Sequence, residues 1–553
     1  MTPPSATAAP DLVQWAKVID HDRCIACHAC TVACKSENQV PLSVTRTYVK
    51  HVEVGAFPRV RRAYQVTRCN QCADAPCVTA CPTSAMFKRP DGIVDFNKEA
   101  CIGCKACIAA CPYDAIFINP EDHSAEKCNF CAHRIDMGLE PACVVVCPTG
   151  AILVGDLRDP DSKVARTVHQ HPVQVRRPEK DTRPTLFYKG AHEATLDPLA
   201  ARRPSGGTFA FSEQQKDRHG VPPGDPTSQG PSNSSAAALL TYDVAHRAPW
   251  DFRVSLYTWT KGIAAGVYLV AAFLLLLGVF GWNDPLWVRD VPVLAGLALA
   301  ATAGLLVWDL EHPRRFLYIF LRPQWRSWLV RGGVIITAFG ALLVVQFGVG
   351  VGVAVRAAMG AGAPGGDPTF AASLWWVGVP LAVLTAVYTA YLFAQAKARD
   401  LWQNPLLPVH FLVQAVLAGA ATLLLVSLGG GWMVDQGWME AGGSLGQGGW
   451  LAPSPDRSLA RFVLELLVAG AAALHLLLVL GELTLTHGTA HARAALAQMV
   501  RGRWAYWFWT GVILAAGGLA APWFGPWAAV AALLGLLAYE HAYVQAGQSV
   551  PLA

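Results

Sequence analysis

The chain has 553 residues, of which 53% are hydrophobic and only 15% are charged, and its formal net charge is +5. This length exceeds that of one ordinary domain. A mean hydropathy of +0.32 with so few charges favours a membrane protein that carries a soluble domain. The basic residues form no patch beside stacking aromatic side chains, so we exclude nucleic acid as a partner.

The first twenty residues, MTPPSATAAPDLVQWAKVID, are expected to form a loose tail. They contain neither the apolar core of a secretory signal nor a twin-arginine pair. We therefore expect the segment that follows to stay on the cytoplasmic side of the inner membrane. Reduced thiols are available there, and structural disulfides are unusual.

All sixteen cysteines lie between residues 24 and 147, in four groups of four. Each group ends in C-x3-C, and three of these endings run directly into proline, at Pro82, Pro112 and Pro148. A C-x2-C-x2-C loop supplies three thiolates to one cubane, whereas the fourth cysteine faces a neighbouring cluster. The sequence therefore predicts four [4Fe-4S] clusters with these ligands: Cys24, Cys27, Cys30, Cys34, Cys69, Cys72, Cys77, Cys81, Cys101, Cys104, Cys107, Cys111, Cys128, Cys131, Cys143 and Cys147.

Two other uses of cysteine fit this segment less well. Structural zinc also uses C-x2-C pairs, but it does not require the repeated C-x2-C-x2-C-x3-C-P pattern. A disulfide framework would be unusual in the cytoplasm. The first group departs from the others in having Lys35 where they have proline, which changes the loop and not the number of ligands.

Short strand-like runs accompany the cysteine groups, at residues 64–67, 92–95, 115–119 and 151–154. A repeated order of cysteine loop, short helix and strand is typical of ferredoxin-like units. We therefore predict an α+β ferredoxin-like tandem iron–sulfur domain with a C-terminal extension over residues 1–200. Residues 201–250, rich in Gly, Pro and Ser up to residue 237, are expected to form a linker.

From about residue 258 the sequence turns apolar in stretches long enough to cross a bilayer, for which about 20 residues suffice. We predict an all-α polytopic membrane domain over residues 251–553, with eight transmembrane helices at 258–281, 291–309, 328–354, 373–396, 406–429, 459–483, 505–522 and 526–544.

Basic residues are concentrated in the loops on the side of the cysteine-rich domain, at Arg314, Arg315, Arg322, Arg326, Lys397, Arg399, Arg493, Arg501 and Arg503. The opposite loops carry fewer, at Arg289, Arg356 and Arg457. The positive-inside rule then places the cysteine-rich domain in the cytoplasm.

Several segments resemble known families. CNQCADAPCVTACPTSAMF, CIGCKACIAACPYDAI and KCNFCAHRIDMGLEPACVVVCPTGAI are similar to the four-cluster electron-transfer subunits of molybdopterin oxidoreductases of the dimethyl sulfoxide and polysulfide reductase type. WDLEHPRRFLYIFLRPQWRSWLVRGG, which follows GIAAGVYLV, is similar to the NrfD/polysulfide reductase membrane anchor. The resemblance implies a natural fusion of two subunits, a molybdopterin (bisPGD) catalytic partner, and an anchor that reacts with membrane quinone, either ubiquinone or menaquinone.

The resemblance also implies how the cysteines are shared among the four clusters. The first and fourth groups form one pair of clusters, and the second and third groups form another. The implied quartets are Cys24, Cys27, Cys30 with Cys147; Cys128, Cys131, Cys143 with Cys34; Cys69, Cys72, Cys77 with Cys111; and Cys101, Cys104, Cys107 with Cys81.

A quinone site needs an apolar slot, hydrogen bonds to two carbonyl oxygens and a proton path. Polar side chains at membrane helices are costly without a role. The richest group lies at the cysteine-domain end of the second span, and two more residues lie at the same level in the first span. We therefore predict a quinone site formed by Asp309, Glu311, His312, Arg315, Tyr257 and Lys261. The alternative is that Glu311-His312-Pro313 only ends a helix and the arginines only anchor it.

No haem is expected, because the two lone histidines His410 and His475 do not make the pattern of a haem-binding bundle. Since no P-loop or dinucleotide fingerprint occurs, the catalytic site is expected in a partner. The sequence thus predicts an electron-transfer and membrane-anchor subunit of a molybdenum or tungsten oxidoreductase. Two alternatives stay open: a module of a respiratory assembly with a cytochrome or hydrogenase-like partner, in which the anchor is a scaffold or translocates protons, and a free-standing ferredoxin:quinone reductase.

Overall fold

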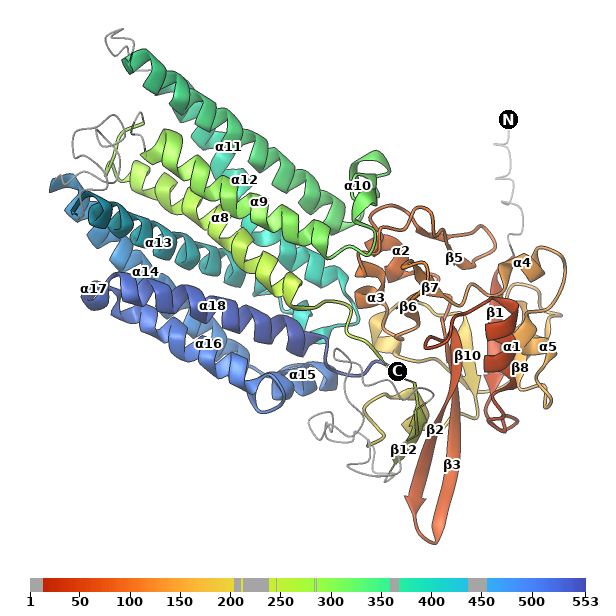
Figure 1. Ribbon diagram of the computed structural model, residues 1–553. Helices are drawn as coiled ribbons and strands as arrows, with labels where there is room; N and C mark the ends of the chain where they lie inside the picture. The colour runs from red at the N-terminus through yellow and green to blue at the C-terminus, as the bar shows by residue number, and fades with distance from the viewer. Residues whose placement is uncertain are drawn as a thin grey trace, which may run out of the picture.

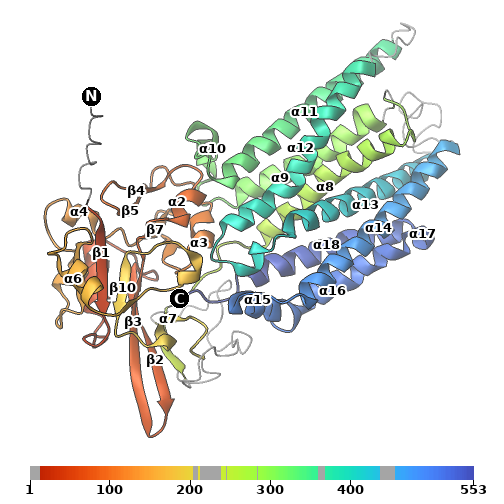
Figure 2. The ribbon, with the colours of Figure 1, turned by 180° about the vertical axis from the view of Figure 1, so that it is seen from behind.

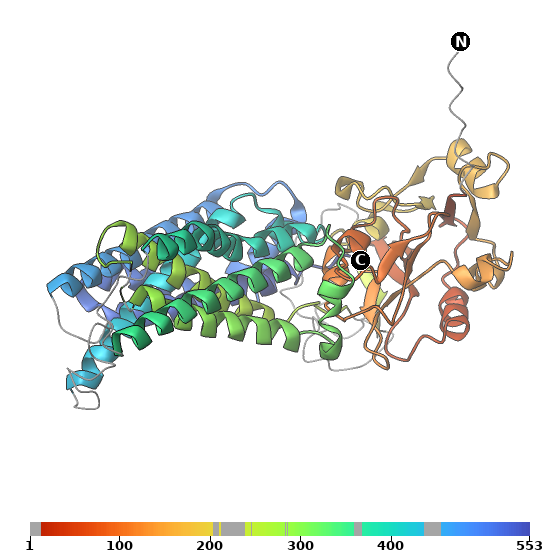
Figure 3. The same cartoon turned by 90° about the horizontal axis from the view of Figure 1, so that it is seen from above.

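The computed structural model describes residues 13–202, 210–211, 238–244, 246–282, 284, 286–358, 368–435 and 455–553. A domain of short strands and helices stands at one end of a long bundle of helices (Figures 1 and 2). Figure 3 shows from above that the two parts meet end to end. The protein is therefore an α+β domain followed by an all-helical domain, as predicted.

Two copies of one small unit form the part of the first domain nearest the bundle. They comprise α2 (Pro76–Ala80) with the hairpin β4 (Met86–Lys88) and β5 (Val94–Phe96), and α3 (Ala106–Ala110) with the hairpin β6 (Ile116–Ile118) and β7 (Ala125–Lys127). Both helices end at a cysteine that precedes proline, and a residue before proline is pushed out of the helical region. Cys81 and Cys111 accordingly have extended backbones, with ψ angles of 120° and 113°.

Two four-stranded sheets complete the first domain. The first sheet has the order β8 (Ile152–Asp156), β1 (Trp15–Asp20), β10 (Leu186–Lys189) and β9 (Val173–Gln174). The second has the order β11 (Ala210–Phe211), β12 (Leu239–Asp243), β2 (Thr47–Ala56) and β3 (Arg59–Arg68). The β2–β3 hairpin projects away from the rest of the domain (Figure 1).

Five further short helices pack around the two sheets. They are α1 (Ala29–Glu37), α4 (Ala132–Ile135), α5 (Ala142–Val145), α6 (Lys163–Gln170) and α7 (Glu193–Leu196). Two of them, α1 and α5, carry Cys30, Cys34 and Cys143. Side chains cap two others: the Ser162 hydroxyl accepts a hydrogen bond from the Ala165 amide at 3.0 Å at the start of α6, and the His192 ring accepts one from the Ala194 amide at 3.1 Å at the start of α7.

The predicted strands occur close to their expected places. Residues 64–67 lie within β3, and residues 115–119 and 151–154 coincide with β6 and β8, whereas β5 begins two residues later than 92. Most of the expected linker, residues 203–209 and 212–237, lies outside the described residues. Its last part forms β12, which pairs antiparallel with β2, so this part belongs to the sheet of the first domain.

Among the described residues, eight helices are long and apolar enough to cross a membrane, as predicted. They are α8 (Phe252–Leu276), α9 (Val291–Trp308) with the preceding turn Leu286–Asp290, α11 (Trp328–Ala358), α12 (Pro368–Gln395), α13 (Leu407–Asp435), α14 (Pro455–Thr484), α16 (Ala505–Gly517) continued by α17 (Ala521–Phe524), and α18 (Pro526–Gly547). Helices α8, α13 and α18 are the most buried of the eight and form the centre of the bundle.

The first transmembrane helix begins six residues earlier than predicted. Asp251 caps it, because its carboxylate accepts a hydrogen bond from the Arg253 amide at 2.9 Å. The hydropathy pattern did not predict this start, because the first turn of the helix contains polar residues. The helix ends after Leu276, where Gly278 adopts a left-handed backbone with φ 70°.

Helices α8 and α13 cross at a pair of glycines. A methyl group added to Gly266 would collide with the main chain of Ala415, and one added to Gly419 would collide with the main chain of Gly266. Small residues allow such close approach, which lets dispersion forces hold membrane helices together. The sequence therefore places its two smallest side chains where the central helices touch.

We expect the variant Gly266→Ala to lower the thermal unfolding midpoint of the detergent-solubilised protein. The added methyl group overpacks the crossing, at a cost of about 1–3 kcal/mol. Gly296→Ala in α9 is the matched control, because nothing lies within 4 Å of its added methyl group. The control should be neutral or stabilising by up to about 1 kcal/mol. Equal midpoints for the two variants would contradict this description of the crossing.

Candidate iron–sulfur and quinone sites

All sixteen cysteines belong to the described residues, and none takes part in a disulfide. Within the described parts of the chain, no three Cys, His, Asp or Glu side chains converge as one metal ion would require. Instead, thiols from two different groups surround each of two cavities. One is lined by Cys24, Cys27, Cys30 and Cys147, and the other by Cys81, Cys101, Cys104 and Cys107. Four thiols around a cavity are the donor set that a cubane uses.

The other two expected quartets are also neighbours in space. The Asn38 side-chain amide lies 3.6 Å from the sulfur of Cys34 and 3.7 Å from that of Cys131, so it joins the first and fourth groups. Cys77 interacts electrostatically with Cys69, Cys72 and Cys111. The fold thus brings together the four sets of cysteines that the resemblance implies.

The cysteine loops turn their backbone amides inward. Left-handed residues interrupt each loop, with φ angles of 59° at His28, 48° at Gln71, 61° at Lys105 and 65° at Phe130. Such alternation gathers N–H groups into a concave nest, a feature of many iron–sulfur sites. Amides donate to cysteine sulfurs at 3.3–3.5 Å, namely those of Ala151 to Cys147, Met86 to Cys81, and Gly103 and Ala125 to Cys101. These non-glycine turns leave no mark in the sequence, so the spacing of cysteines alone did not predict them.

Burial makes most of these thiols hard to ionise. It raises the pKa of Cys34 and of Cys111 to about 12. Cys143 is the exception: burial opposes its ionisation, but Lys17 and Arg68 outweigh this effect and lower the pKa of the thiol to about 7. Since a metal ligand must lose its proton, cluster assembly and local charge are coupled in this domain.

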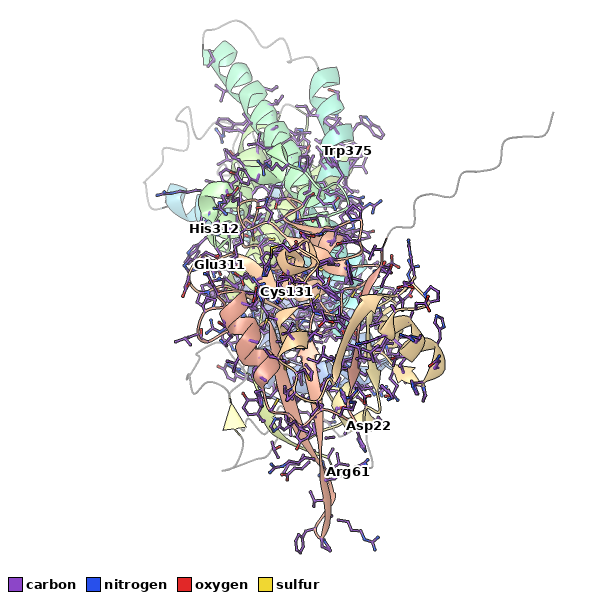
Figure 4. All side chains as sticks on the ribbon, turned by 90° about the vertical axis from the view of Figure 1, so that its right-hand side faces the viewer. Asp22, Arg61, Cys131, Glu311, His312 and Trp375 are labelled. Carbon is purple, nitrogen blue, oxygen red and sulfur yellow. The ribbon has the colours of Figure 1, made fainter. Side chains whose placement is uncertain are left out.

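The third cysteine loop docks through main-chain groups on the turn of the membrane domain that carries Glu311 and His312, both labelled in Figure 4. The amide of Glu311 donates to the carbonyl oxygen of Gly103 at 3.4 Å, and the amide of His312 donates to that of Ile102 at 3.2 Å. The Arg315 guanidinium donates to the carbonyl oxygen of Cys101 at 3.0 Å. The turn after α9 is therefore in contact with the loop that carries Cys101, Cys104 and Cys107.

A buried ion network lies beside this docking contact. The Lys105 ammonium is 3.4 Å from a carboxylate oxygen of Asp309 and 3.1 Å from one of Glu311. Arg253, in the first turn of α8, is 3.5 Å from Asp309. Burial raises the pKa of Asp309 to about 6, although Lys105 and Arg253 oppose the rise. Asp309 can therefore exchange a proton near neutral pH.

The predicted quinone residues separate into two sets. Asp309, Glu311, His312 and Arg315 lie together at the junction, whereas Tyr257 and Lys261 are buried in α8 inside the bundle. The Lys261 ammonium donates to the carbonyl oxygen of Ala386 at 2.7 Å and to the Thr389 hydroxyl at 3.0 Å. Tyr257 interacts electrostatically with Asp309, which links the two sets.

His312 offers a free hydrogen-bonding atom at the junction. Its Nε2 is buried and has no hydrogen-bond partner within the described residues. A buried polar atom without a partner is costly, so such an atom commonly serves a bound molecule. Burial lowers the pKa of His312, which favours the neutral imidazole.

A cleft of about 440 Å³ opens on the same junction. Glu311 and Lys105 line it together with His123, Asp251 and Arg253. His123 is 3.6 Å from the carboxylate of Glu311, so the cleft connects solvent with the ion network.

The bundle holds a second polar region that single spans did not reveal. His410 and His475, on α13 and α14, lie 2.9 Å apart, and the Thr258 hydroxyl donates to Glu540 at 2.7 Å. Tyr539 donates to Glu482 at 3.2 Å. Each pair joins different helices, so no periodicity along one helix could predict it. Arg461 and Glu465, four residues apart on α14, pair at 2.9 Å, as their spacing suggests.

The fold and these sites define a class: an iron–sulfur electron-transfer protein fused to a polytopic membrane anchor. Residues 60–157 match the family described as "4Fe-4S dicluster domain", and residues 242–432 match "Polysulphide reductase, NrfD".

The first third of the chain has close relatives. The iron–sulfur domain is similar to the B subunit of tetrathionate reductase from Salmonella typhimurium, with 45% identity over 193 residues, which are 34% of this chain and 77% of that protein. The B component of polysulfide reductase from Wolinella succinogenes is 41% identical, over 32% of this chain and 93% of that protein. The arsenate respiratory reductase iron–sulfur subunit of a Shewanella species is 36% identical, over 31% of this chain and 94% of that protein. This protein belongs to the same family of iron–sulfur subunits of reductase complexes, here continued by an NrfD membrane domain.

The variant Gly103→Ala should weaken the junction. Gly103 has φ 69°, and a methyl group there would collide with the side chain of Glu311. We expect a loss of stability of about 1–3 kcal/mol from strain and overpacking, together with slower electron transfer between clusters and membrane. Thermal unfolding and stopped-flow reoxidation of the clusters by quinone measure the two effects.

Gly138→Ala is the matched control for that variant. Gly138 has a similar φ of 73°, but nothing lies within 4 Å of an added methyl group. It should share the backbone strain and leave the electron-transfer rate unchanged. A normal rate of cluster reoxidation in Gly103→Ala would show that electron transfer to the membrane does not depend on this contact.

Proposed function

We propose that this protein relays electrons between a molybdopterin (bisPGD) catalytic subunit and membrane quinone through four [4Fe-4S] clusters. The clusters use the sixteen cysteines in the four quartets given above. When bound, they supply one-electron transfer, and the chain provides their cages and their distance from the membrane. The partner and its molybdenum or tungsten cofactor are proposed from the resemblance to molybdopterin oxidoreductases.

The docking of the third cysteine loop on the turn after α9 carries this proposal. Main-chain hydrogen bonds from Glu311 and His312 hold the loop at the end of a membrane helix. A cluster in the Cys81, Cys101, Cys104 and Cys107 cage would lie beside the ion network of Asp309. Electrons and protons could then meet a quinone at one place, which is what its two-electron, two-proton chemistry requires.

The opposite end of the domain is the proposed contact with the catalytic subunit. Cys27 is exposed there, although most of the cysteines are buried. Neighbouring apolar side chains are exposed as well: Ile25 at 59%, Val32 at 66% and Val145 at 59%. An apolar surface around an exposed cluster ligand suits a protein partner that must bring its own redox group close.

At the quinone end, the proposed roles follow from burial and contacts. Asp309 exchanges a proton, and Nε2 of His312 donates to a quinone carbonyl oxygen. Glu311 and Lys105 connect the site with the solvent-filled cleft. Arg315 holds the cysteine loop, while Tyr257 and Lys261 are the proposed polar groups on the bundle side of the quinone.

We further propose that the iron–sulfur domain faces the cytoplasm and that the anchor lies in the inner membrane. The excess of basic residues at the domain's end of the bundle supports this orientation. No haem takes part in the proposed path. His410 and His475 hydrogen-bond to each other at 2.9 Å, an arrangement that turns these two nitrogens toward each other and not toward an iron.

Anaerobic purification of the native complex tests the cofactors and the partner. We expect about sixteen irons per chain, corresponding to four cubanes, and near-stoichiometric molybdenum or tungsten in a co-purifying subunit. Elemental analysis and mass spectrometry of the complex provide the measurement. A b-type or c-type haem band with no molybdenum or tungsten would instead favour the respiratory module with a cytochrome partner.

The variant Asp309→Asn tests the quinone site. Loss of a proton-exchanging group should slow quinone reduction by roughly a hundredfold or more. In the wild type the protonated carboxyl is the donor, so the rate should fall as the pH rises through about 6. In the opposite direction the carboxylate accepts the proton, so quinol oxidation should rise through the same pH. The Asn variant should show neither step.

Asp251→Asn is the matched control, because Asp251 contacts the same arginine, Arg253, at 2.8 Å. It should keep the rate and a pH step, which moves to lower pH because the charge of Asp251 helps to raise the pKa of Asp309. Normal activity and an unchanged pH profile in Asp309→Asn would exclude the proposed site.

A further inference from the structure

Three cationic side chains are almost completely buried among the cysteine groups. Lys17 on β1 and Arg68 at the end of β3 are each 2% exposed, and Lys127 at the end of β7 is fully buried. Long cationic side chains are rarely buried this deeply unless an anion accompanies them. Their partners therefore need to be identified.

Each of the three faces cysteines. An Arg68 Nη1 donates to the sulfur of Cys143 at 3.0 Å, and the Lys17 ammonium lies 3.9 Å from the same sulfur. Arg68 also interacts with Cys30, which the proposed sharing assigns to the neighbouring cluster. It thus lies between the two outermost cages.

Lys127 takes the corresponding place beside the second group. It interacts electrostatically with Cys69 and Cys77, while its ammonium donates to the carbonyl oxygens of Val94 and Cys128. The three cations therefore serve three of the four proposed cages.

None of the three has a carboxylate within 4 Å among the described residues. Two other buried cations of the domain differ from them in this respect. Arg46 pairs with Glu126 at 3.2 Å, and Lys105, in the cysteine loop nearest the membrane, pairs with both Asp309 and Glu311. The membrane-side cage thus has a neutralised cation, whereas the outer cages have uncompensated ones.

A buried charge without a counter-charge is strongly destabilising. We propose that Lys17, Arg68 and Lys127 are fixed counter-charges for the three outer clusters and raise the reduction potentials of these clusters relative to the membrane-side one. A cubane with four thiolate ligands is an anion, and a one-electron reduction makes it more negative. Fixed cations beside its sulfurs therefore favour the reduced form. This inference rests on the proposed cluster assignment.

Redox titration of the anaerobic native complex, followed by electron paramagnetic resonance, tests it with neutral variants of similar size. Lys17→Met, Lys127→Met and Arg68→Gln should each weaken reduction of the adjacent cluster at least tenfold. For a one-electron couple this lowers the midpoint by about 59 mV. Arg68→Lys keeps the charge and should stay near the wild-type midpoint. The membrane-side cluster should not shift in any of these variants.

Arg61→Gln is the control for net charge. Arg61 is exposed on the projecting β2–β3 hairpin, away from the labelled Cys131 (Figure 4). It should leave every midpoint unchanged. Iron content is measured on every sample, and only variants with the wild-type amount enter the comparison.

Fully loaded neutral variants with unchanged midpoints would overturn the inference. If Arg68→Gln loses iron while Arg68→Lys retains it, cluster assembly requires the positive charge, which supports the inference. If both variants lose iron, assembly requires the shape of the Arg68 side chain. The midpoints of Lys17→Met and Lys127→Met then test the inference. Too little iron in the wild type would instead overturn the cluster assignment itself.

Discussion

The main-chain contact between the Cys101–Cys107 loop and the turn after α9 is the constraint on which the rest of the structure depends. Its hydrogen bonds use the backbone of Gly103, Glu311 and His312. A contact made by backbone groups fixes position more firmly than one between long, mobile side chains, and salt screens it less than an ion pair. It also explains why a glycine stands in the loop, because any larger residue at Gly103 would meet Glu311. The contact places the Cys101–Cys107 loop directly against the end of a membrane helix.

Buried lysine and arginine side chains accompany the cysteine groups of the first domain. Some buried cations pair with carboxylates, as Arg46 does with Glu126. Where cysteines gather, cations face sulfur, as Arg68 does at Cys143. Both arrangements obey the same rule, since a charge removed from water requires an opposite charge or a set of hydrogen bonds. The second arrangement has a functional consequence under the proposed cluster assignment, because a cluster bound by these sulfurs would change its charge with each electron.

Local patterns in the sequence predicted much of the architecture. The Cys-Pro endings of α2 and α3 act on the neighbouring residue alone, and hydropathy over 20 residues is enough to find eight spans. Features made by distant segments were not predictable in this way. The pairing of β12 with β2, the left-handed turns at His28 and Lys105, and the His410–His475 contact all depend on what the fold brings together. The candidate quinone residues show the same limit: composition identified them, but only the fold separates the junction set around Asp309 from Lys261.

Side-chain contacts hold the segment between the two domains just before it enters the membrane domain. After β12, His246 bonds to Asp243 and to Asp114, and burial is outweighed by these two carboxylates, which raise the pKa of the imidazole to about 9. Four residues later, the Trp250 indole donates to the carbonyl oxygen of Cys104 at 3.2 Å and stacks on Trp402. The segment is thus attached to the cysteine domain immediately before α8 begins.

Such a covalent connection reduces the binding free energy that the contacts at the junction must supply. Two separate proteins lose translational and rotational freedom when they associate, and a covalent link removes most of this cost by raising the effective concentration. Beside its apolar contacts the junction then needs few hydrogen bonds: Arg315 donates to the carbonyl oxygen of Cys101, and Arg176 donates to that of Leu552. Fusion therefore allows polar groups at the junction, which the proposed proton exchange beside a cluster would require.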